Sequence, residues 1–166
     1  MAVLKRISLT VFYKFMFFII KHKLMPTIKT EYLGDLRTQA THVQSSTQIL
    51  TDAPLDNKGK GEAFSPSDLV AGALGSCMMT IMGIAAQADG IDLKGSEMEI
   101  TKGMSADAPR RIARIGVQLN MVSKVPLSQP QQDRLERAAY TCPVALSLHP
   151  DIEQAVEFSW RVDQEA

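Results

Sequence analysis

A long apolar segment between Ser65 and Gly90 limits the possible folds of this chain more than any other feature. Ser65 is a good helix N-cap, Pro66 suits the first helical position, and Asp68 stands where the partner in a capping box belongs. The pair Asp89-Gly90 marks the end of the helix. Apolar residues occupy every face between these limits, which predicts a helix from about Ser65 to Asp89 that is buried on all sides.

The chain has two cysteines, and both are predicted to lie on helices. Cys142 precedes Pro143 at the expected start of a short helix, where free N–H groups and the positive end of the helix dipole favour a thiolate. Cys77 lies about three turns into the long helix, so it gains little from a dipole and needs a cation from elsewhere in the fold. A lone buried cysteine is often only a packing residue, and it is the second thiol that favours redox chemistry.

Composition restricts the function classes. The chain has 166 residues, of which 45% are hydrophobic and 22% are charged, as in an ordinary globular domain. Its 18 basic residues balance 18 acidic ones, so nothing favours binding to nucleic acid. Two cysteines without a Cys-x-x-Cys motif argue against a disulfide-rich secreted scaffold and a zinc site, and His42 and His149 lack ligand spacing. We therefore expect a cytoplasmic protein with reduced thiols and no metal.

The rest of the chain predicts an α+β fold. Short strands joined by turns make a meander over 28–53, followed by a polar loop at 56–61 that lacks the features of a phosphate-binding loop. A hairpin is expected over 97–122, an amphipathic helix from Ser128 to about Tyr140, and a last strand over 155–162. There is no regular βαβ repetition, which favours an α+β architecture.

A helix that is apolar on every face predicts a homodimer. One sheet can cover one side of the helix, but a chain of this size has little left to cover the other side. Two copies related by a twofold axis would enclose both helices between sheets. We therefore expect a homodimer in which Cys77 is mostly buried.

Residues 1–24 precede the patterned part of the chain. They contain basic residues and an apolar run over 15–20, which is too short to cross a bilayer, and no small-x-small cleavage site precedes Met25. The segment is either a basic amphipathic anchor on a surface or an upstream extension outside the functional fold. We favour the extension, because strand-like sequence starts at Ile28, and we expect one domain over 25–166 without an integral membrane span.

Three short motifs carry a family resemblance. Ser-Pro-Ser-Asp-Leu at 65–69, Ala-Leu-Gly-Ser-Cys at 73–77 and Thr-Cys-Pro-Val at 141–144 together resemble the osmotically inducible protein C and organic hydroperoxide resistance (OsmC/Ohr) family. The resemblance extends from Met25 to the C-terminus. It implies antiparallel sheets packed on a long central helix, and an intertwined homodimer with its active sites at the subunit interface.

The resemblance also implies roles for individual residues. Family members place an arginine in a Gly-x-x-Arg turn against the peroxidatic thiolate, and Gly34 to Arg37 match that turn, so Arg37 is the candidate cation for Cys77. A glutamate that orients the arginine in the peroxide reductases is replaced here by Ser67. Asp68 would point about 100° away around the helix. Glu62 in the preceding loop is therefore the preferred substitute, and the chain looks more like an OsmC-like branch of the family.

The resemblance implies a thiol peroxidase with peroxiredoxin-type chemistry. Cys77 would attack a hydroperoxide and become a sulfenic acid, Cys142 would resolve it as a disulfide, and an external dithiol or lipoyl-type reductant would restore the thiols. This chemistry needs a cation and a dry pocket but no metal, flavin or haem cofactor. The rival hypothesis is a non-catalytic binding protein for a small hydrophobic ligand, in which loss of the glutamate has reduced turnover.

Overall fold

The computed structural model describes residues 25–163, so the expectations for residues 1–24 lie outside the described part. The chain divides into two compact units at the junction of Ala63 and Phe64. We call residues 25–63 the N-terminal unit and residues 64–163 the C-terminal unit, and each is described by itself. The mixed composition of helices and sheets confirms the predicted α+β class.

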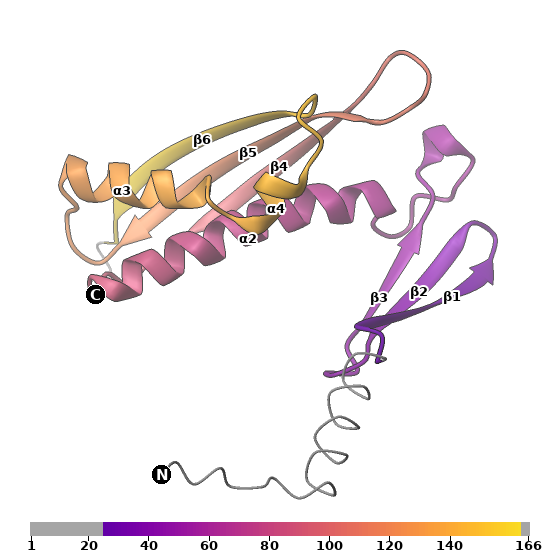
Figure 1. Cartoon of the computed structure of the whole chain (residues 1–166), viewed down its shortest axis with the longest axis horizontal. Helices are drawn as coiled ribbons and strands as arrows, with labels where there is room; N and C mark the ends of the chain where they lie inside the picture. The colour runs from indigo at the N-terminus through magenta and orange to yellow at the C-terminus, as the bar shows by residue number, and fades with distance from the viewer. Residues whose placement is uncertain (1–24, 164–166) are drawn as a thin grey trace, which may run out of the picture. The chain divides into compact units, whose positions relative to one another are not determined.

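The N-terminal unit is a three-stranded antiparallel meander, as predicted from the short alternating segments (Figure 1). Its strands are β1 (Ile28–Gly34), β2 (Arg37–His42) and β3 (Gln48–Asp52), and a 3₁₀ turn, η1 (Leu55–Asn57), follows them. The tight turn between β1 and β2 has positive φ at Gly34, at 85°, a conformation that glycine adopts without steric cost. This turn makes Arg37 the first residue of β2.

The meander buries very little apolar surface. In this unit only Thr51 and Asp52 are fully buried, and both are polar. Apolar side chains such as Ile28 and Tyr32 are 56% and 64% exposed. A small sheet of this kind has marginal stability without a surface to pack against.

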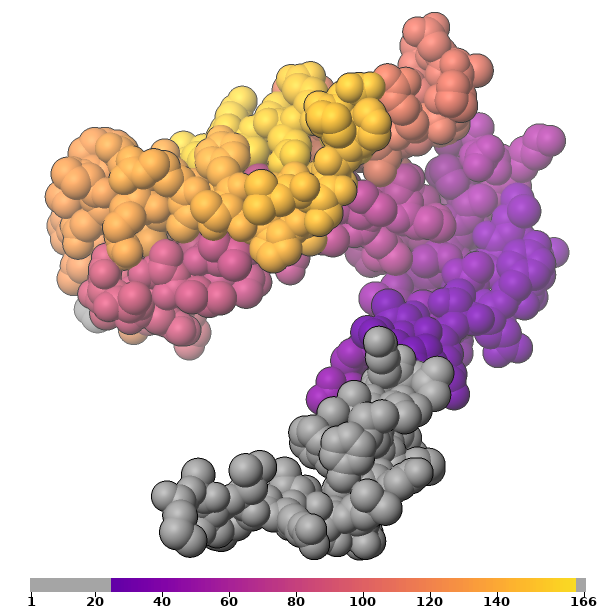
Figure 2. All heavy atoms as spheres, in the orientation of Figure 1, coloured from indigo at the N-terminus to yellow at the C-terminus, as the bar shows by residue number. Residues whose placement is uncertain are grey.

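The C-terminal unit packs three helices against one face of a second three-stranded sheet (Figure 1). Its elements are α2 (Pro66–Ala88), β4 (Glu97–Met104), β5 (Ile112–Ser123), α3 (Gln129–Ala139), α4 (Pro143–Ser147) and β6 (Glu153–Val162). The long helix α2 contacts β4 and β5 as well as α3 and α4. Figure 2 shows α3, in orange, lying along α2, in pink and magenta.

The predicted helix boundaries are confirmed by their caps. Ser65 and Asp68 form the reciprocal capping box at the start of α2, and the helix ends at Asp89. Ser128 and Gln131 form the equivalent box at the start of α3. These signals are local in sequence, which is why they could be predicted without knowledge of the tertiary structure.

One strand pairing differs from the antiparallel sheets that the family resemblance implies. β4 and β5 form the predicted antiparallel hairpin, but β6 pairs parallel to β5, from Arg114 opposite Glu153 to Ser123 opposite Val162. A parallel pair needs a crossover connection, which α3 and α4 provide. Two helices between the strands return the chain to the end of the sheet where β5 began.

Within the C-terminal unit α2 is buried on one face, whereas the sequence predicts burial on all sides in a homodimer. The buried apolar residues recur every three or four positions and form the core with β5: Ala71, Leu74, Met78, Met82 and Ala86. On other faces Val70 and Ile84 remain 39% and 60% exposed. By length and composition alone α2 would also pass as a membrane span, as many core helices of soluble proteins do. One sheet and two short helices cover one face of α2 and leave the rest uncovered.

Candidate functional site

The two thiols meet inside the C-terminal unit. Cys77 is half-buried on α2, whereas Cys142 is fully buried at the N-cap of α4, and the two helices are in contact. Cys142 belongs to the hydrophobic core cluster, and Cys77 packs against that cluster. The position of Cys142 at the N-cap with Pro143 after it confirms the local prediction from the Cys-Pro pair.

The pKa of Cys142 is shifted in the opposite direction to the sequence-based expectation. Burial in the apolar core raises the pKa of the Cys142 thiol, and hydrogen bonding and charge interaction with Cys77 raise it further. The backbone N–H of Ala145 donates to the Cys142 sulfur at 3.2 Å, which lowers the pKa but does not outweigh the burial. The predicted contact of the sulfur with an N–H group at the helix start is confirmed, but the predicted lowering of the Cys142 pKa is wrong, because desolvation by the core exceeds the effect of one short helix.

A second cluster of charged side chains lies within the N-terminal unit. The Nη2 group of Arg37 donates to Glu62 Oε2 and, at 3.2 Å, to Asp52 Oδ2. These hydrogen bonds, with Glu62 contributing most, raise the pKa of Arg37. The structure therefore brings Arg37 and Glu62 together as an ion pair.

Asp52 was not singled out from the sequence. It lies directly opposite Arg37 in the β2–β3 ladder and is only 1% exposed. A hydrogen bond from the backbone N–H of Glu62, at 3.0 Å, is the largest cause that lowers the pKa of Asp52, and Arg37 and the N–H of Lys60 lower it further. The signal that could have identified Asp52 is an acidic residue opposite a basic one in neighbouring strands. This pairing can be recognised only once the strand register is known.

At the position where the resemblance implies a glutamate, this chain has a serine with different hydrogen-bond partners. Ser67 accepts a hydrogen bond at 2.8 Å from Nζ of Lys102, and Asp68 Oδ1 accepts another at 2.6 Å. Burial raises the pKa of Asp68, but hydrogen bonds from Lys102 and Ser65 outweigh it, so the pKa lies below its usual range. Asp68 is thus engaged with Lys102 at the start of α2 and with its own capping box.

The predicted site residues therefore form two groups, one in each unit. Cys77 and Cys142, the two thiols, belong to the C-terminal unit. Arg37 and Glu62 belong to the N-terminal unit and supply charge, together with Asp52. Residues 25–163 contain no group of three or more histidine, cysteine or carboxylate side chains that could hold a metal ion.

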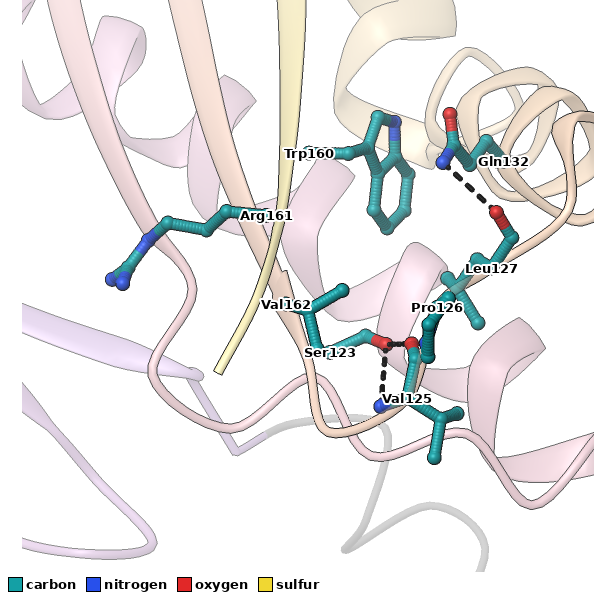
Figure 3. A pocket seen from close by; sticks show the side chains of 8 residues that line it. All are labelled: Ser123, Val125, Pro126, Leu127, Gln132, Trp160, Arg161 and Val162. Carbon is teal, nitrogen blue, oxygen red and sulfur yellow. Dashed lines mark hydrogen bonds between the residues drawn. The ribbon is translucent and has the colours of Figure 1, made fainter. Parts of the chain in front are cut away.

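A cavity of about 250 Å³ near the ends of β5 and β6 does not contain either thiol (Figure 3). Its polar groups already have partners. Gln132 donates to the carbonyl of Leu127, and the Trp160 indole donates to Glu136. Arg161, whose backbone helps to line the cavity, points its side chain away from the other residues (Figure 3). The cavity is an apolar groove without a free titratable group aimed into it.

Comparison with known proteins assigns a family to most of the chain. Residues 59–157 match the family model of OsmC-like proteins. No curated protein shows significant similarity to the sequence. A crystal structure from Psychrobacter arcticus 273-4, of a protein whose name refers to osmotic stress induction and detoxification response, is 50% identical, with a TM-score of 0.76 over 81% of this chain and 96% of that one.

More distant solved structures share the fold. An organic hydroperoxide resistance protein OsmC from Legionella pneumophila is 18% identical, with a TM-score of 0.61 over 81% of this chain and 98% of that one. An organic hydroperoxide resistance protein from Elizabethkingia anophelis, with thiocyanate bound, is 15% identical, with a TM-score of 0.64 over 84% and 99% of the two chains.

Proposed function

Because this chain belongs to the OsmC-like protein family, we propose that it is a thiol-dependent peroxidase that reduces organic hydroperoxides or related oxidants in defence against oxidative stress. The observation that carries the proposal is the contact between two thiols in unequal surroundings. Cys77 is partly accessible, whereas Cys142 is fully buried, and this burial raises the pKa of its thiol. Such a pair has one thiol suited to attack an oxidant and a neighbour suited to react afterwards.

In the first step of this proposal, Cys77 attacks as a thiolate. Its sulfur bonds to the distal oxygen of the hydroperoxide, the O–O bond breaks, and the leaving oxygen takes a proton and departs as an alcohol. Cys77 becomes a sulfenic acid. Arg37 stabilises the negative charge that develops on oxygen, and Glu62 orients the guanidinium through their ion pair.

In the second step, Cys142 resolves the sulfenic acid. Its sulfur bonds to that of Cys77, the sulfenic oxygen leaves as water with the thiol proton, and a disulfide remains. An external dithiol, of which a lipoyl group is one example, then supplies two electrons and two protons. The burial of Cys142 and its raised pKa suit this order, because both make the thiol less reactive toward peroxide than an accessible thiol is.

We further propose that the functional form is a homodimer. The uncovered residues of α2, such as Ile84, and the exposed apolar side chains of the meander, such as Tyr32, are surfaces that a second copy would cover. A dimer mass by light scattering would support this, and a monomer at all concentrations would contradict it.

The test is a peroxidase assay with alkyl hydroperoxides of different chain length and a panel of dithiols. We expect the wild type to turn over many times. Cys142→Ser should consume about one equivalent of peroxide per chain and then stop, because its sulfenic acid has no resolving thiol. If the wild type consumes no more than Cys142→Ser with every dithiol, the two-thiol cycle is wrong. If neither protein reacts, the enzyme proposal fails and a non-catalytic binding role replaces it.

A further inference from the structure

The charged cluster of the N-terminal unit contains two carboxylates for one arginine, and they differ in accessibility. The side chain of Glu62 is 63% exposed, whereas that of Asp52 is completely buried. An ion pair between exposed groups holds its members only weakly, because water and salt screen it. The pair with Asp52 is shielded from that screening.

We propose that Asp52 is a positioning residue, which fixes the guanidinium of Arg37 and the loop that carries Glu62 in one arrangement. Oδ2 of Asp52 accepts from Arg37 Nη2 at 3.2 Å and from the Glu62 backbone N–H at 3.0 Å. Oδ1 is within 3.5 Å of the Lys60 backbone N–H. The same carboxylate therefore joins strand β2 to the loop at 60–62, and it holds Arg37 and Glu62 next to each other. This inference rests on the proposed peroxidase function and adds a residue to its machinery.

The N–H donors of Arg37 that do not bind the two carboxylates indicate what this arrangement does. A guanidinium has five N–H donors, and both carboxylates bind through Nη2. Nε of Arg37 is buried and has no hydrogen-bond partner within the described residues. A guanidinium that is fixed from behind keeps its other donors aimed in a constant direction, which is what stabilisation of a developing oxyanion requires.

The first experiment compares Asp52→Asn with Asp35→Asn. The first variant keeps the shape of the side chain but removes the charge that holds Arg37. Asp35→Asn is the matched control, since it makes the same change at an exposed residue of this unit, whose carboxylate pairs with Lys60 Nζ at 3.1 Å. We expect Asp52→Asn to slow the oxidation of Cys77 on the order of 10-fold to 100-fold, and Asp35→Asn to leave it unchanged. Equal rates in all three proteins would overturn the proposal.

A double-mutant cycle separates positioning from a general loss of structure. If Asp52 acts through Arg37, then Asp52→Asn should have no further effect on the oxidation rate in the Arg37→Ala background. Additive losses would mean that Asp52 acts independently of the arginine, and would overturn the proposal. If Asp52→Asn does not fold, Arg37→Lys provides the test. Lysine keeps the charge but cannot bridge both carboxylates, so a wild-type rate in that variant would also contradict the proposal.

A measurement that needs no peroxidase activity distinguishes this inference from the proposed function. The Nε–H signal of Arg37 can be identified by NMR from its absence in Arg37→Ala. We expect its exchange with water to be at least about tenfold faster in Asp52→Asn, and unchanged in Asp35→Asn. Unchanged exchange in Asp52→Asn overturns the positioning role whatever the activity. If the wild type has no peroxidase activity but exchange is faster in Asp52→Asn, then Asp52 still positions Arg37 and only the proposed function fails.

Discussion

The N-terminal and C-terminal units are stabilised in opposite ways. The C-terminal unit has an apolar core in which Leu74, Met78 and Leu119 are fully buried. The N-terminal unit buries only two polar side chains and leaves its apolar residues exposed. A unit with its own core can hold a pair of thiols in place. A thin sheet has to rely on its hydrogen-bond ladder, on charge pairs such as Arg37 with Asp52, and on whatever covers it in the assembled protein.

The difference extends to the proposed chemistry. In the proposal, the C-terminal unit carries the thiols that form and break bonds, whereas the N-terminal sheet carries the charged groups. Loss of a bond-forming atom abolishes a reaction, but loss of a nearby charge only raises its barrier. The contributions of the two units can therefore be distinguished by how strongly a substitution in each unit slows the reaction.

The largest effect is expected from Cys77→Ser, compared with Arg37→Ala. Cys77→Ser should abolish consumption of alkyl hydroperoxide, because a serine hydroxyl is not ionised and cannot replace the thiolate. Arg37→Ala should keep the reaction but slow it on the order of 100-fold, because one stabilising group is lost. Stopped-flow measurement of peroxide consumption under single-turnover conditions distinguishes the two outcomes.

Two results would break this division of roles. Equal consumption by the wild type and Cys77→Ser would remove the thiol from the mechanism and leave the non-catalytic binding role. A wild-type rate for Arg37→Ala would mean that the N-terminal unit contributes no charge to the reaction, so that the Arg37–Glu62 pair is only a surface ion pair.

A smaller effect, on stability, is expected from one leucine in each unit. Leu74 on α2 is 0% exposed, and Leu74→Ala should lower the free energy of unfolding by about 2–5 kcal/mol through the cavity that it leaves. Leu55 in the 3₁₀ turn is 77% exposed, and Leu55→Ala should change the free energy of unfolding by about 0.5 kcal/mol or less. Urea unfolding followed by circular dichroism measures both. Equal losses would show that Leu55 is covered in the assembled protein.

The sequence predicted the C-terminal unit better than the charged clusters. Helix α2 was predictable with its caps, because Ser65 and Asp68 are three residues apart and apolar periodicity is a local signal. The contact of Lys102 with Asp68 joins positions 34 residues apart, and no local pattern announces it. The pKa of Cys142 was predicted in the wrong direction for the same reason, since the helix dipole is local and burial depends on the whole core.

Asp52 shows the same limit. Its strand was predicted, but its role depends on being opposite Arg37 and under the loop at 60–62, and only the register and the path of that loop reveal this. The arginine and Glu62 could be proposed because a family resemblance supplied a pattern for them. Where neither a local signal nor a resemblance existed, the functional interpretation had to wait for the structure.

The smallest effect is expected from deletion of residues 1–24, which tests whether the two units suffice for the fold and the reaction. Patterned sequence starts after Met25, and the described strands and helices of both units lie at or after Ile28, so neither unit is expected to need the preceding segment. The truncated protein should be dimeric, should melt within about 2 °C of the full chain, and should oxidise Cys77 at the same rate. Scanning calorimetry, light scattering and the single-turnover assay provide the three comparisons. A truncated protein that unfolds readily or fails to dimerise would assign the segment a structural role, and the exposed apolar face of the meander would then be the first surface to examine for its contact.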